Sequence, residues 1–268
     1  MIFWKMNGLG NDYIFVDAVK CSRDELTRLE GNLKTIIPRI CDRHFGAGGD
    51  GLVIMYPSAV ADVRMRMFNA DGSEGKMCGN AVRCIAKYLV DVCGRCGEIA
   101  IETLAGIKTV SVTTDALGKV VSARADMGKV RIVGREGDVV FVDAGNPHAV
   151  IDGNVTDDLE MARAAEICRL RDVNVEVARV TRAHALEVRV WERGSGETLA
   201  CGTGATAAAY VFAYEGKVTF PVSVKLPGGV LTVEYIDGRV YASGNVQLNY
   251  IGELNISCLL YTSPSPRD

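Results

Sequence analysis

The stretch Glu74-Gly75-Lys76-Met77-Cys78-Gly79-Asn80-Ala81 decides how this chain is organised, because a second stretch repeats its pattern: Glu197-Thr198-Leu199-Ala200-Cys201-Gly202-Thr203-Gly204. Both read Glu-x-x-x-Cys-Gly-(Asn/Thr)-small, and the two cysteines are 201 − 78 = 123 positions apart. Ordered similarity at a fixed offset is the sequence signature of a repeated structural unit. The chain is therefore predicted to contain two related halves.

The segments around the two stretches repeat as well. Residues 63–68 align at the same offset with 186–191, and both alternate apolar and polar side chains as a half-buried strand does. Residues 81–90 and 205–214 both have a helical pattern, and each is followed by two β-rich runs with a glycine between them, Gly106 or Gly229. Gly10-Asn11 resembles Gly145-Asn146 at an offset of 146 − 11 = 135, so the halves differ in loop length.

We predict an α+β fold of two pseudosymmetric domains, each with mostly antiparallel strands and one helix that begins just after a Cys-Gly pair. Further helices are expected over residues 23–33, 35–45 and 157–170. The domain boundary is expected in the turn-rich stretch 115–118. The N-terminal half then comprises residues 1–115 with 250–257 returning to it, and the C-terminal half comprises 116–249. Residues 258–268 contain two prolines and no periodicity, and they are expected to form a disordered or non-native tail.

The composition is that of an ordinary globular protein, with 48% hydrophobic residues, 24% charged residues and a formal net charge of −3. This composition predicts neither a nucleic-acid partner nor a membrane partner, because there is no basic stripe and no apolar run of about 20 residues. The first residues do not resemble a signal peptide, so a cytoplasmic location is expected. The nine cysteines are expected to be reduced in that compartment, and most of them to be buried.

Cys78 and Cys201 each stand where a loop is expected to turn into a helix. The free N–H groups of a helix start attract anions, so we expect them to lower the thiol pKa and to bind a carboxylate or a developing enolate. A pseudo-two-fold axis would bring both thiols to one cleft between the domains. One thiolate could then remove an α-proton while the other thiol protonates the opposite face, which is a two-base stereoinversion.

Several motifs together resemble the diaminopimelate epimerase family, in order from Lys5 to about Ile256. They are residues 6–13 (MNGLGNDY), 68–74 (FNADGSE), 77–80 (MCGN), 145–148 (GNPH), 192–198 (ERGSGET) and 200–205 (ACGTGA). The resemblance implies a helix wrapped by antiparallel strands in each half, a central cleft, and a homodimer. It also implies interconversion of LL- and meso-2,6-diaminopimelate without any cofactor or metal, in lysine and peptidoglycan precursor synthesis. Cys78 and Cys201 match the catalytic pair.

The resemblance also assigns roles to the residues around the thiols. Main-chain N–H groups should hold the α-carboxylate of the substrate; they belong to Gly79, Asn80, Gly202 and Thr203. Amide and charged side chains should hold the end that does not react; they are Asn11, Asn69, Asn146, Asn174, Glu192 and Arg193. His148, together with Glu192, is expected to tune the protonation of the thiols. Two positions depart from the family pattern, because Gly51 stands where some relatives carry Gln and Ala81 where many carry Gly.

Four alternatives remain open at this point. A proline or hydroxyproline racemase would also use two thiols, but a small cyclic substrate needs no distal clamp. An isomerase of the phenazine-biosynthesis type would use carboxylate chemistry and would not need both cysteines. The other two are a thiol redox protein and a non-catalytic diaminopimelate-binding protein. Cys93-Gly94-Arg95-Cys96 is a single C-x-x-C without a second ligand pair, which is incomplete for a zinc site.

Overall fold

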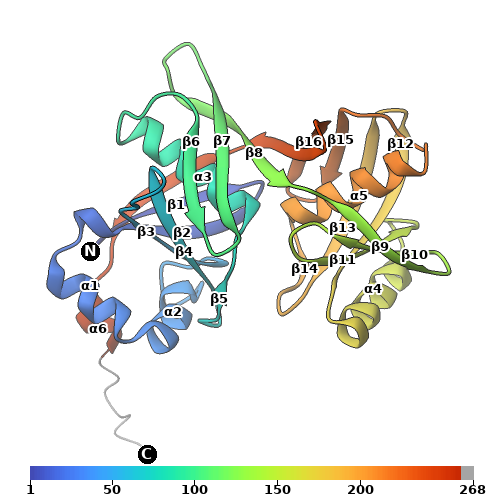
Figure 1. Cartoon of the computed structure of the whole chain (residues 1–268). Coiled ribbons are helices and arrows are strands. Elements are labelled where there is room, and N and C mark those ends of the chain that lie inside the picture. The colour runs from blue at the N-terminus through green and yellow to red at the C-terminus, as the bar shows by residue number, and fades with distance from the viewer. Residues whose placement is uncertain (261–268) are drawn as a thin grey trace, which may run out of the picture.

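The computed structural model describes residues 1–260, and its two halves lie side by side with one sheet running through both (Figure 1). The elements of the first half are β1 (Ile2–Gly8), β2 (Asn11–Asp17), η1 (Ala18–Lys20), α1 (Arg23–Glu30), α2 (Leu33–Cys41), β3 (Gly51–Tyr56), β4 (Val63–Asn69), β5 (Glu74–Gly75), α3 (Gly79–Asp91), β6 (Ile99–Thr103), β7 (Gly106–Thr114) and β8 (Val120–Gly128).

The second half repeats this order with one helix fewer. Its elements are β9 (Arg131–Glu136), β10 (Val139–Asp143), β11 (Pro147–Asp152), α4 (Asp158–Arg171), β12 (Asn174–Arg182), β13 (Ala185–Glu192), β14 (Gly196–Thr198), α5 (Gly202–Tyr214), β15 (Val222–Leu226), β16 (Gly229–Ile236) and β17 (Arg239–Asn245). Strand β18 (Gln247–Glu253) and helix α6 (Ile256–Leu260) then close the described chain.

Strand pairing confirms the duplication. In the first half the order is β18-β1-β2-β3-β4-β6-β7-β8, and only the pairs β2–β3 and β4–β6 are parallel. In the second half the order is β9-β10-β11-β12-β13-β15-β16-β17, and only β11–β12 and β13–β15 are parallel. The parallel pairs therefore fall at equivalent places. The antiparallel pair β8–β17 joins the two halves.

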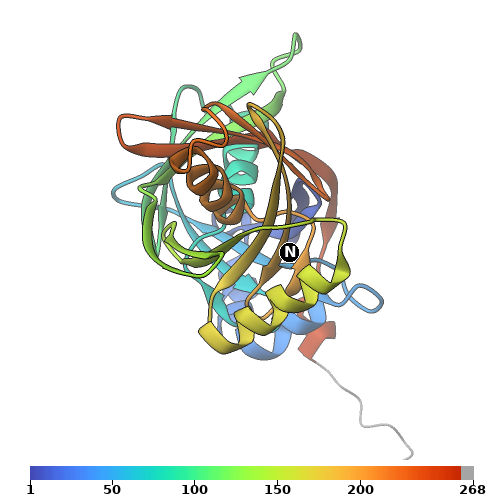
Figure 2. The same cartoon turned by 90° about the vertical axis from the view of Figure 1, so that its right-hand side faces the viewer.

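Each half has a core on both faces of its curved sheet. The strands of the first half curve around α3, and the side chains between them form one core, whereas α1 and α2 cover a second core on the outer face. Helix α5 occupies the inner position of the second half and α4 the outer one, as the view along that half shows (Figure 2). Strand β2 contributes side chains to both cores, because Phe15 faces α3 while Ile14 and Val16 face α1 and α2. Burial on both faces explains the unbroken apolar run in this strand.

The helices expected from the sequence are present as α1, α2 and α4, with ends that differ by a few residues. Helix α2 continues through Pro38, and Ile36, Ile37 and Ile40 pack it against β3 with no exposed surface. Within residues 1–260, no helix has both the length and the apolar character needed to cross a membrane.

The structure favours a later domain boundary than the turn at residues 115–118. That turn joins β7 to β8, and β8 still contributes Val120, Ala123 and Met127 to the core around α3. Val130 is the first residue of the chain in the core around α5. We therefore propose that the halves meet between Gly128 and Val130. Strand β18 returns to pair with β1, beginning slightly earlier than the expected return at residue 250.

Residues 258–260, which the sequence assigned to a disordered or non-native tail, belong instead to a helix. Cys258 and Leu259 belong to α6, whose Leu259 packs against the outer core of the first half. The main-chain oxygen of Leu259 also accepts a hydrogen bond of 2.5 Å from Arg39. Burial of an apolar side chain and a satisfied carbonyl thus hold this turn, which periodicity could not reveal in so short a segment. The rest of the expected tail, 261–268, lies outside the described residues.

Candidate active site

The two Cys-Gly pairs meet at the junction of the halves. Cys78 is the N-cap of α3 and Cys201 the N-cap of α5, and both have extended backbone angles. The first residues of the two helices touch, because a Cβ placed on Gly79 would lie 3.8 Å from the Cα of Gly202. Met127 covers both glycines, since its Cε would lie 3.0 Å and 3.6 Å from Cβ atoms at Gly79 and Gly202. Two helix N-termini therefore open at one place, with a thiol beside each.

Cys78 is partly exposed and is surrounded by donors and one acceptor. Its thiol donates to the side-chain oxygen of Asn11 at 3.6 Å. The main-chain N–H groups of Asn80 and Ala81 and the hydroxyl of Tyr13 lie within hydrogen-bonding reach of its sulfur and lower the pKa of the thiol. These contacts come from the start of α3 and from β2, which places Cys78 between helix and sheet.

Cys201 is buried and lies among acids. Its sulfur is 3.4 Å from the hydroxyl of Thr203, which together with the N–H of Gly204 lowers the pKa of the thiol. Glu192 and Glu176 act in the opposite direction and raise that pKa. Glu192 itself is held by a hydrogen bond from the hydroxyl of Thr198. The two thiols thus have different surroundings despite their equivalent positions.

The N–H groups of the helix starts lower the thiol pKa as expected, but burial outweighs them, so the net pKa shift of both thiols is upward. Burial raises the pKa of Cys78, and it raises the pKa of Cys201 well above its ordinary value. The main-chain donors do act in the expected direction, but the loss of hydration at the closed junction is larger. Burial also raises the pKa of Glu192. Loss of hydration at the junction therefore disfavours the charged forms of all three side chains.

A cleft of about 850 Å³ leads to this junction from the side of α2 and the β13–β14 turn. Four of the expected binding residues line it: Asn11, Asn69, Glu192 and Arg193. Asn11 connects the cleft to the thiols, because its side chain receives the Cys78 thiol on its oxygen and donates to Asp50 at 3.1 Å from its nitrogen. Asn69 donates to Ser73 at 2.9 Å.

Arg193 lines the second-half wall of the cleft, whereas Asn174, which does not line it, holds the main chain of Arg193 from the interior. The buried Asn174 accepts a hydrogen bond of 2.9 Å from the main-chain N–H of Arg193 through its side-chain oxygen. The guanidinium of Arg193 donates to the carboxylate of Asp172 at 2.9 Å and to its main-chain oxygen at 3.2 Å. Asp172 is highly exposed. A ligand carboxylate would therefore compete with an exposed ion pair, which contributes little energy.

His148 and Asn146 lie behind Cys201 rather than on the cleft wall. His148 Nδ1 is 2.7 Å from the Glu176 carboxylate, and both side chains are fully buried. Nε2 of the same ring is 3.0 Å from the side-chain oxygen of Asn146. Glu176 in turn presses against the start of α5, because a Cβ on Gly204 would lie 2.5 Å from its Oε1. Asn146 thus contacts His148 and does not line the cleft as expected.

Tyr13 is a site residue that sequence reasoning missed. It lines the cleft, its hydroxyl reaches Cys78, and its pKa is raised well above the ordinary value by burial and by the Cys78 charge. The offset of 135 that relates Asn11 to Asn146 also relates Tyr13 to His148, so the repeat contained the signal. Tyr13 also explains Gly51, since a Cβ there would lie 2.1 Å from the oxygen of Phe68 and 2.8 Å from the Tyr13 ring. A glutamine has no room at this position.

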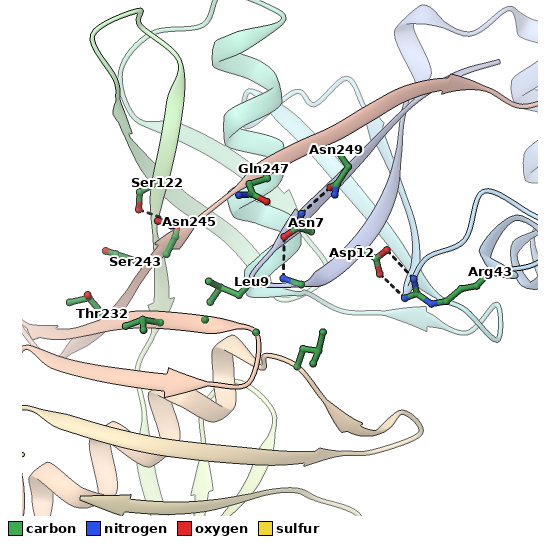
Figure 3. A pocket seen from close by; sticks show the side chains of 16 residues that line it. Asn7, Leu9, Asp12, Arg43, Ser122, Thr232, Ser243, Asn245, Gln247 and Asn249 are labelled. Atoms are coloured by element: carbon green, nitrogen blue, oxygen red, sulfur yellow. Dashed lines mark hydrogen bonds and ion pairs between the residues drawn. The ribbon is translucent and has the colours of Figure 1, made fainter. Parts of the chain in front are cut away.

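A second cavity, of about 930 Å³, lies across the junction and contains no thiol (Figure 3). Its wall is mostly neutral and polar, with Asn245, Gln247 and a hydrogen-bonded pair, Asn7 and Asn249, at 2.9 Å. The charged groups drawn there, Asp12 and Arg43, are already paired at 2.7 Å. Neither cavity is lined by Cys78 or Cys201, but the cleft of about 850 Å³ is lined by Asn11, Tyr13 and Glu192, which contact these thiols, so it is the better candidate for chemistry.

Comparison with known proteins agrees with the geometry. The family model described as diaminopimelate epimerase matches residues 3–133 and 138–249. A curated diaminopimelate epimerase of Methanococcus maripaludis is 40% identical, over 96% of this chain and 100% of that protein. Another, of Desulfovibrio desulfuricans, is 39% identical over 95% of this chain and 98% of that protein.

Solved structures show the same fold at low identity. A probable proline racemase of Agrobacterium radiobacter has a TM-score of 0.71 at 13% identity, covering 95% of this chain and 92% of that one. A Bacillus anthracis protein of the PhzF phenazine-biosynthesis family has a TM-score of 0.68 at 15% identity, covering 95% and 99%. These two share the architecture, whereas the family model and the curated relatives match nearly the whole sequence. This chain belongs to the diaminopimelate epimerase family.

Proposed function

We propose that this protein interconverts LL- and meso-2,6-diaminopimelate by a two-thiol mechanism at Cys78 and Cys201. The observation that carries the proposal is the contact between Gly79 and Gly202, which puts the two thiol-bearing helix starts on either side of one point. A substrate α-carbon held beside this contact, between the two thiols, would have one sulfur on each face. Family membership supports the choice of substrate.

The reaction conserves atoms and charge. One cysteine, as thiolate, takes the α-proton, and the electron pair of the C–H bond passes into the α-carboxylate. The other cysteine, as thiol, delivers its proton to the opposite face and is left as the thiolate. The product is the epimer, and the thiols have exchanged protonation states. The reverse reaction uses the same groups in the opposite order.

The helix starts supply the donors that this charge movement needs. The first N–H groups of a helix have no partner within the helix. Those of Gly79, Asn80, Gly202 and Thr203 are proposed to hold the α-carboxylate and the additional charge that it accepts in the transition state. Donors fixed in place before the reaction stabilise such charge strongly when water is excluded. Expulsion of water by the substrate also strengthens each of these contacts.

The cleft is proposed to hold the distal amino-acid group. Arg193 would bind its carboxylate, Glu192 would face its ammonium, and Asn11, Asn69 and Asn174 would complete the hydrogen bonds. His148 and Asn146 lie behind Cys201, so their proposed part is to set the position and charge of Glu176 and the second thiol. A proline-sized substrate would leave this end of the cleft unused.

The decisive test is α-proton exchange in deuterated water. The reduced full-length protein is incubated with LL-diaminopimelate, with proline in parallel, and the α-proton signal is followed by NMR. We expect exchange and formation of the meso isomer with the first substrate and no exchange with the second. Exchange with proline alone would move the assignment to an amino-acid racemase. No exchange with either substrate would contradict the two-thiol proposal.

Serine variants test whether Cys78 and Cys201 are the acid and base of the reaction. Cys78→Ser and Cys201→Ser should each lose inversion, because serine has too high a pKa to act as the base. Cys93→Ser is the matched control, since Cys93 is an exposed cysteine beyond the end of α3. This control should keep full activity. A Cys78→Ser variant that still inverts the substrate would exclude Cys78 from the mechanism.

We also propose a cytoplasmic homodimer. The edge strand β18 carries three exposed large apolar side chains, Leu248, Tyr250 and Ile251. An exposed apolar edge strand is a ready surface for a second chain. Light scattering after size-exclusion chromatography should give twice the chain mass, and Ile251→Asp should shift the protein to the monomer. A monomeric parent protein would contradict this part of the proposal.

A further inference from the structure

Arg83 is the largest fully buried side chain in the described chain, and it lies one helical turn after Cys78. Its Nη2 donates to the side-chain oxygen of Asn80, whereas Nε and Nη1 have no hydrogen-bond partner within residues 1–260. Burial lowers the pKa of Arg83. An incompletely satisfied buried guanidinium is costly. A buried guanidinium at the junction of the halves is therefore expected to have a function that offsets this free-energy cost.

Glycines from three elements surround the guanidinium. Cβ atoms placed on Gly8, Gly202 and Gly244 would lie 3.3 Å, 3.8 Å and 3.6 Å from its terminal nitrogens. Gly8 ends β1, Gly202 begins α5, and Gly244 lies in β17. The charge therefore lies between the halves, directly beneath the point where α3 and α5 begin.

Arg83 also determines how the Asn80 amide is turned. A guanidinium only donates, so the oxygen of Asn80 must face it and the nitrogen must face the other way. That nitrogen donates to Asn11 at 3.2 Å and to the main-chain oxygen of Ala200 at 3.1 Å. Asn11 receives the Cys78 thiol, and Ala200 directly precedes Cys201. One amide thus links the two thiol-bearing loops, and Arg83 holds that amide.

Within residues 1–260, only the first half has a buried arginine bonded to an amide after its Cys-Gly pair. Position 83 + 123 = 206 in the second half is Thr206, whose hydroxyl donates to the main-chain oxygen of Thr203 at 2.7 Å. The titratable side chains that act on the two thiols from the strands are Tyr13 on β2, Glu176 on β12 and Glu192 on β13, with Asp50 beside Tyr13 and His148 beside Glu176. None of the three that act on the thiols directly carries a positive charge. Arg83 supplies a permanent positive charge beneath both helix starts.

We propose that Arg83 is a positioning residue for both thiols: it locks the Asn80 amide across the junction and stabilises negative charge at the two helix starts. This inference rests on the proposed two-thiol function. Substrate does not have to touch Arg83, since the guanidinium acts through Asn80 and through its charge. Its loss should therefore affect the chemical step more than substrate binding.

The test compares Arg83→Met and Arg83→Lys with Lys87→Met as the matched control. Lys87 is one turn further along α3 and pairs with Asp91 at 2.7 Å, away from the junction. Arg83→Met should lower kcat by about tenfold or more, the effect of losing a hydrogen bond with a charged group. KM should change less, and the alkaline rise of the rate should move to higher pH. Arg83→Lys should recover part of the rate, and Lys87→Met should keep the parent pH profile.

Thiol alkylation makes the result independent of the substrate. The rates at which iodoacetamide labels Cys78 and Cys201 are measured by peptide mass spectrometry across pH. Arg83→Met should slow labelling at neutral pH by about tenfold. If the folded Arg83→Met protein kept the parent pH profiles for both exchange and labelling, the proposal would be overturned. Failure of the parent to exchange diaminopimelate would instead contradict the proposed function, and labelling would still decide the role of Arg83.

Asn80→Asp keeps the test decisive if Arg83→Met does not fold. The aspartate would pair with Arg83, neutralise its charge, and remove the donor to Ala200. We expect the same loss of kcat and the same slowing of labelling as for Arg83→Met. A folded Asn80→Asp protein with parent-like rates would overturn the proposal as well.

Discussion

Gly79 and Gly202, the first residues of α3 and α5, lie against each other, since a Cβ placed on Gly202 would be 3.6 Å from the Cα of Gly79. Each follows a cysteine, so the two thiols stand where the first turns of α3 and α5 meet.

Mild oxidation should join Cys78 to Cys201 and stop the reaction. The closeness of the two helix starts brings the thiols within reach of each other after a small movement, and a disulfide would leave neither a base nor an acid. Inactivation by diamide and recovery with dithiothreitol are measured by the exchange assay, together with peptide mapping. The variant with both Cys93→Ser and Cys96→Ser removes an exposed pair that could react first. Full activity in the mapped disulfide form would contradict the two-thiol mechanism.

Gly204→Ala should destabilise the protein. The added Cβ would lie 2.5 Å from Glu176 Oε1 and 3.1 Å from Glu176 Cγ, and Glu176 cannot move easily because it is fully buried and held by His148. Overpacking of this kind costs about 1–3 kcal/mol in the free energy of unfolding. Urea unfolding provides the measurement. Gly134→Ala is the control, because a Cβ there meets nothing within 4 Å, and equal stability of the two variants would refute the steric argument.

Tyr13→Phe should slow alkylation of Cys78 at neutral pH while leaving Cys201 nearly unchanged. The hydroxyl of Tyr13 lowers the pKa of Cys78, so its removal reduces the thiolate fraction. A hydrogen bond with a charged group corresponds to roughly tenfold in rate. The two labelling rates are read from separate peptides in one sample, which makes Cys201 the internal control. An unchanged rate at Cys78 would show that the phenol does not act on this thiol.

The free energy of unfolding should fall in alkaline solution through Cys84. Burial raises the pKa of Cys84 from 9.0 to about 12. A pKa that is raised in the folded state gives stability that is present below pH 9.0 and lost as the pH rises toward about 12. Within that window the loss is about 1.4 kcal/mol per pH unit for one group.

Cys84→Ala should therefore show a shallower alkaline decline than the parent, whatever its stability at neutral pH. Urea unfolding of both proteins across the window measures the two slopes. Other buried thiols and phenols contribute the same background to both, because only position 84 differs. Parallel declines in the two proteins would contradict the assignment to Cys84.

The sequence by itself determined the class of the fold and the position of both cysteines, because these features depend on short stretches of chain. The repeated Cys-Gly stretches, the strands before them and the helices after them are set by periodicity and by the freedom of glycine, which act over a few residues. The duplication, the α+β class and the placement of both cysteines at helix starts were therefore predictable. So was the meeting of the two halves at one junction, since a repeated unit tends to pack against its copy.

Only the tertiary structure decided the electrostatics of the site and its long-range contacts. Helix starts alone would lower the thiol pKa, but burial by segments far apart in the chain reverses the sign. Glu176 acts on Cys201 from β12, and the hydroxyl of Tyr13 reaches Cys78 from β2, although both residues are far from these cysteines in the chain. In the sequence, Gly51 only appears as a position where some relatives carry Gln. In the fold, the absence of a side chain at Gly51 makes room for the Tyr13 ring. Hydration and close packing are properties of the assembled interior, which is why a single segment could not reveal them.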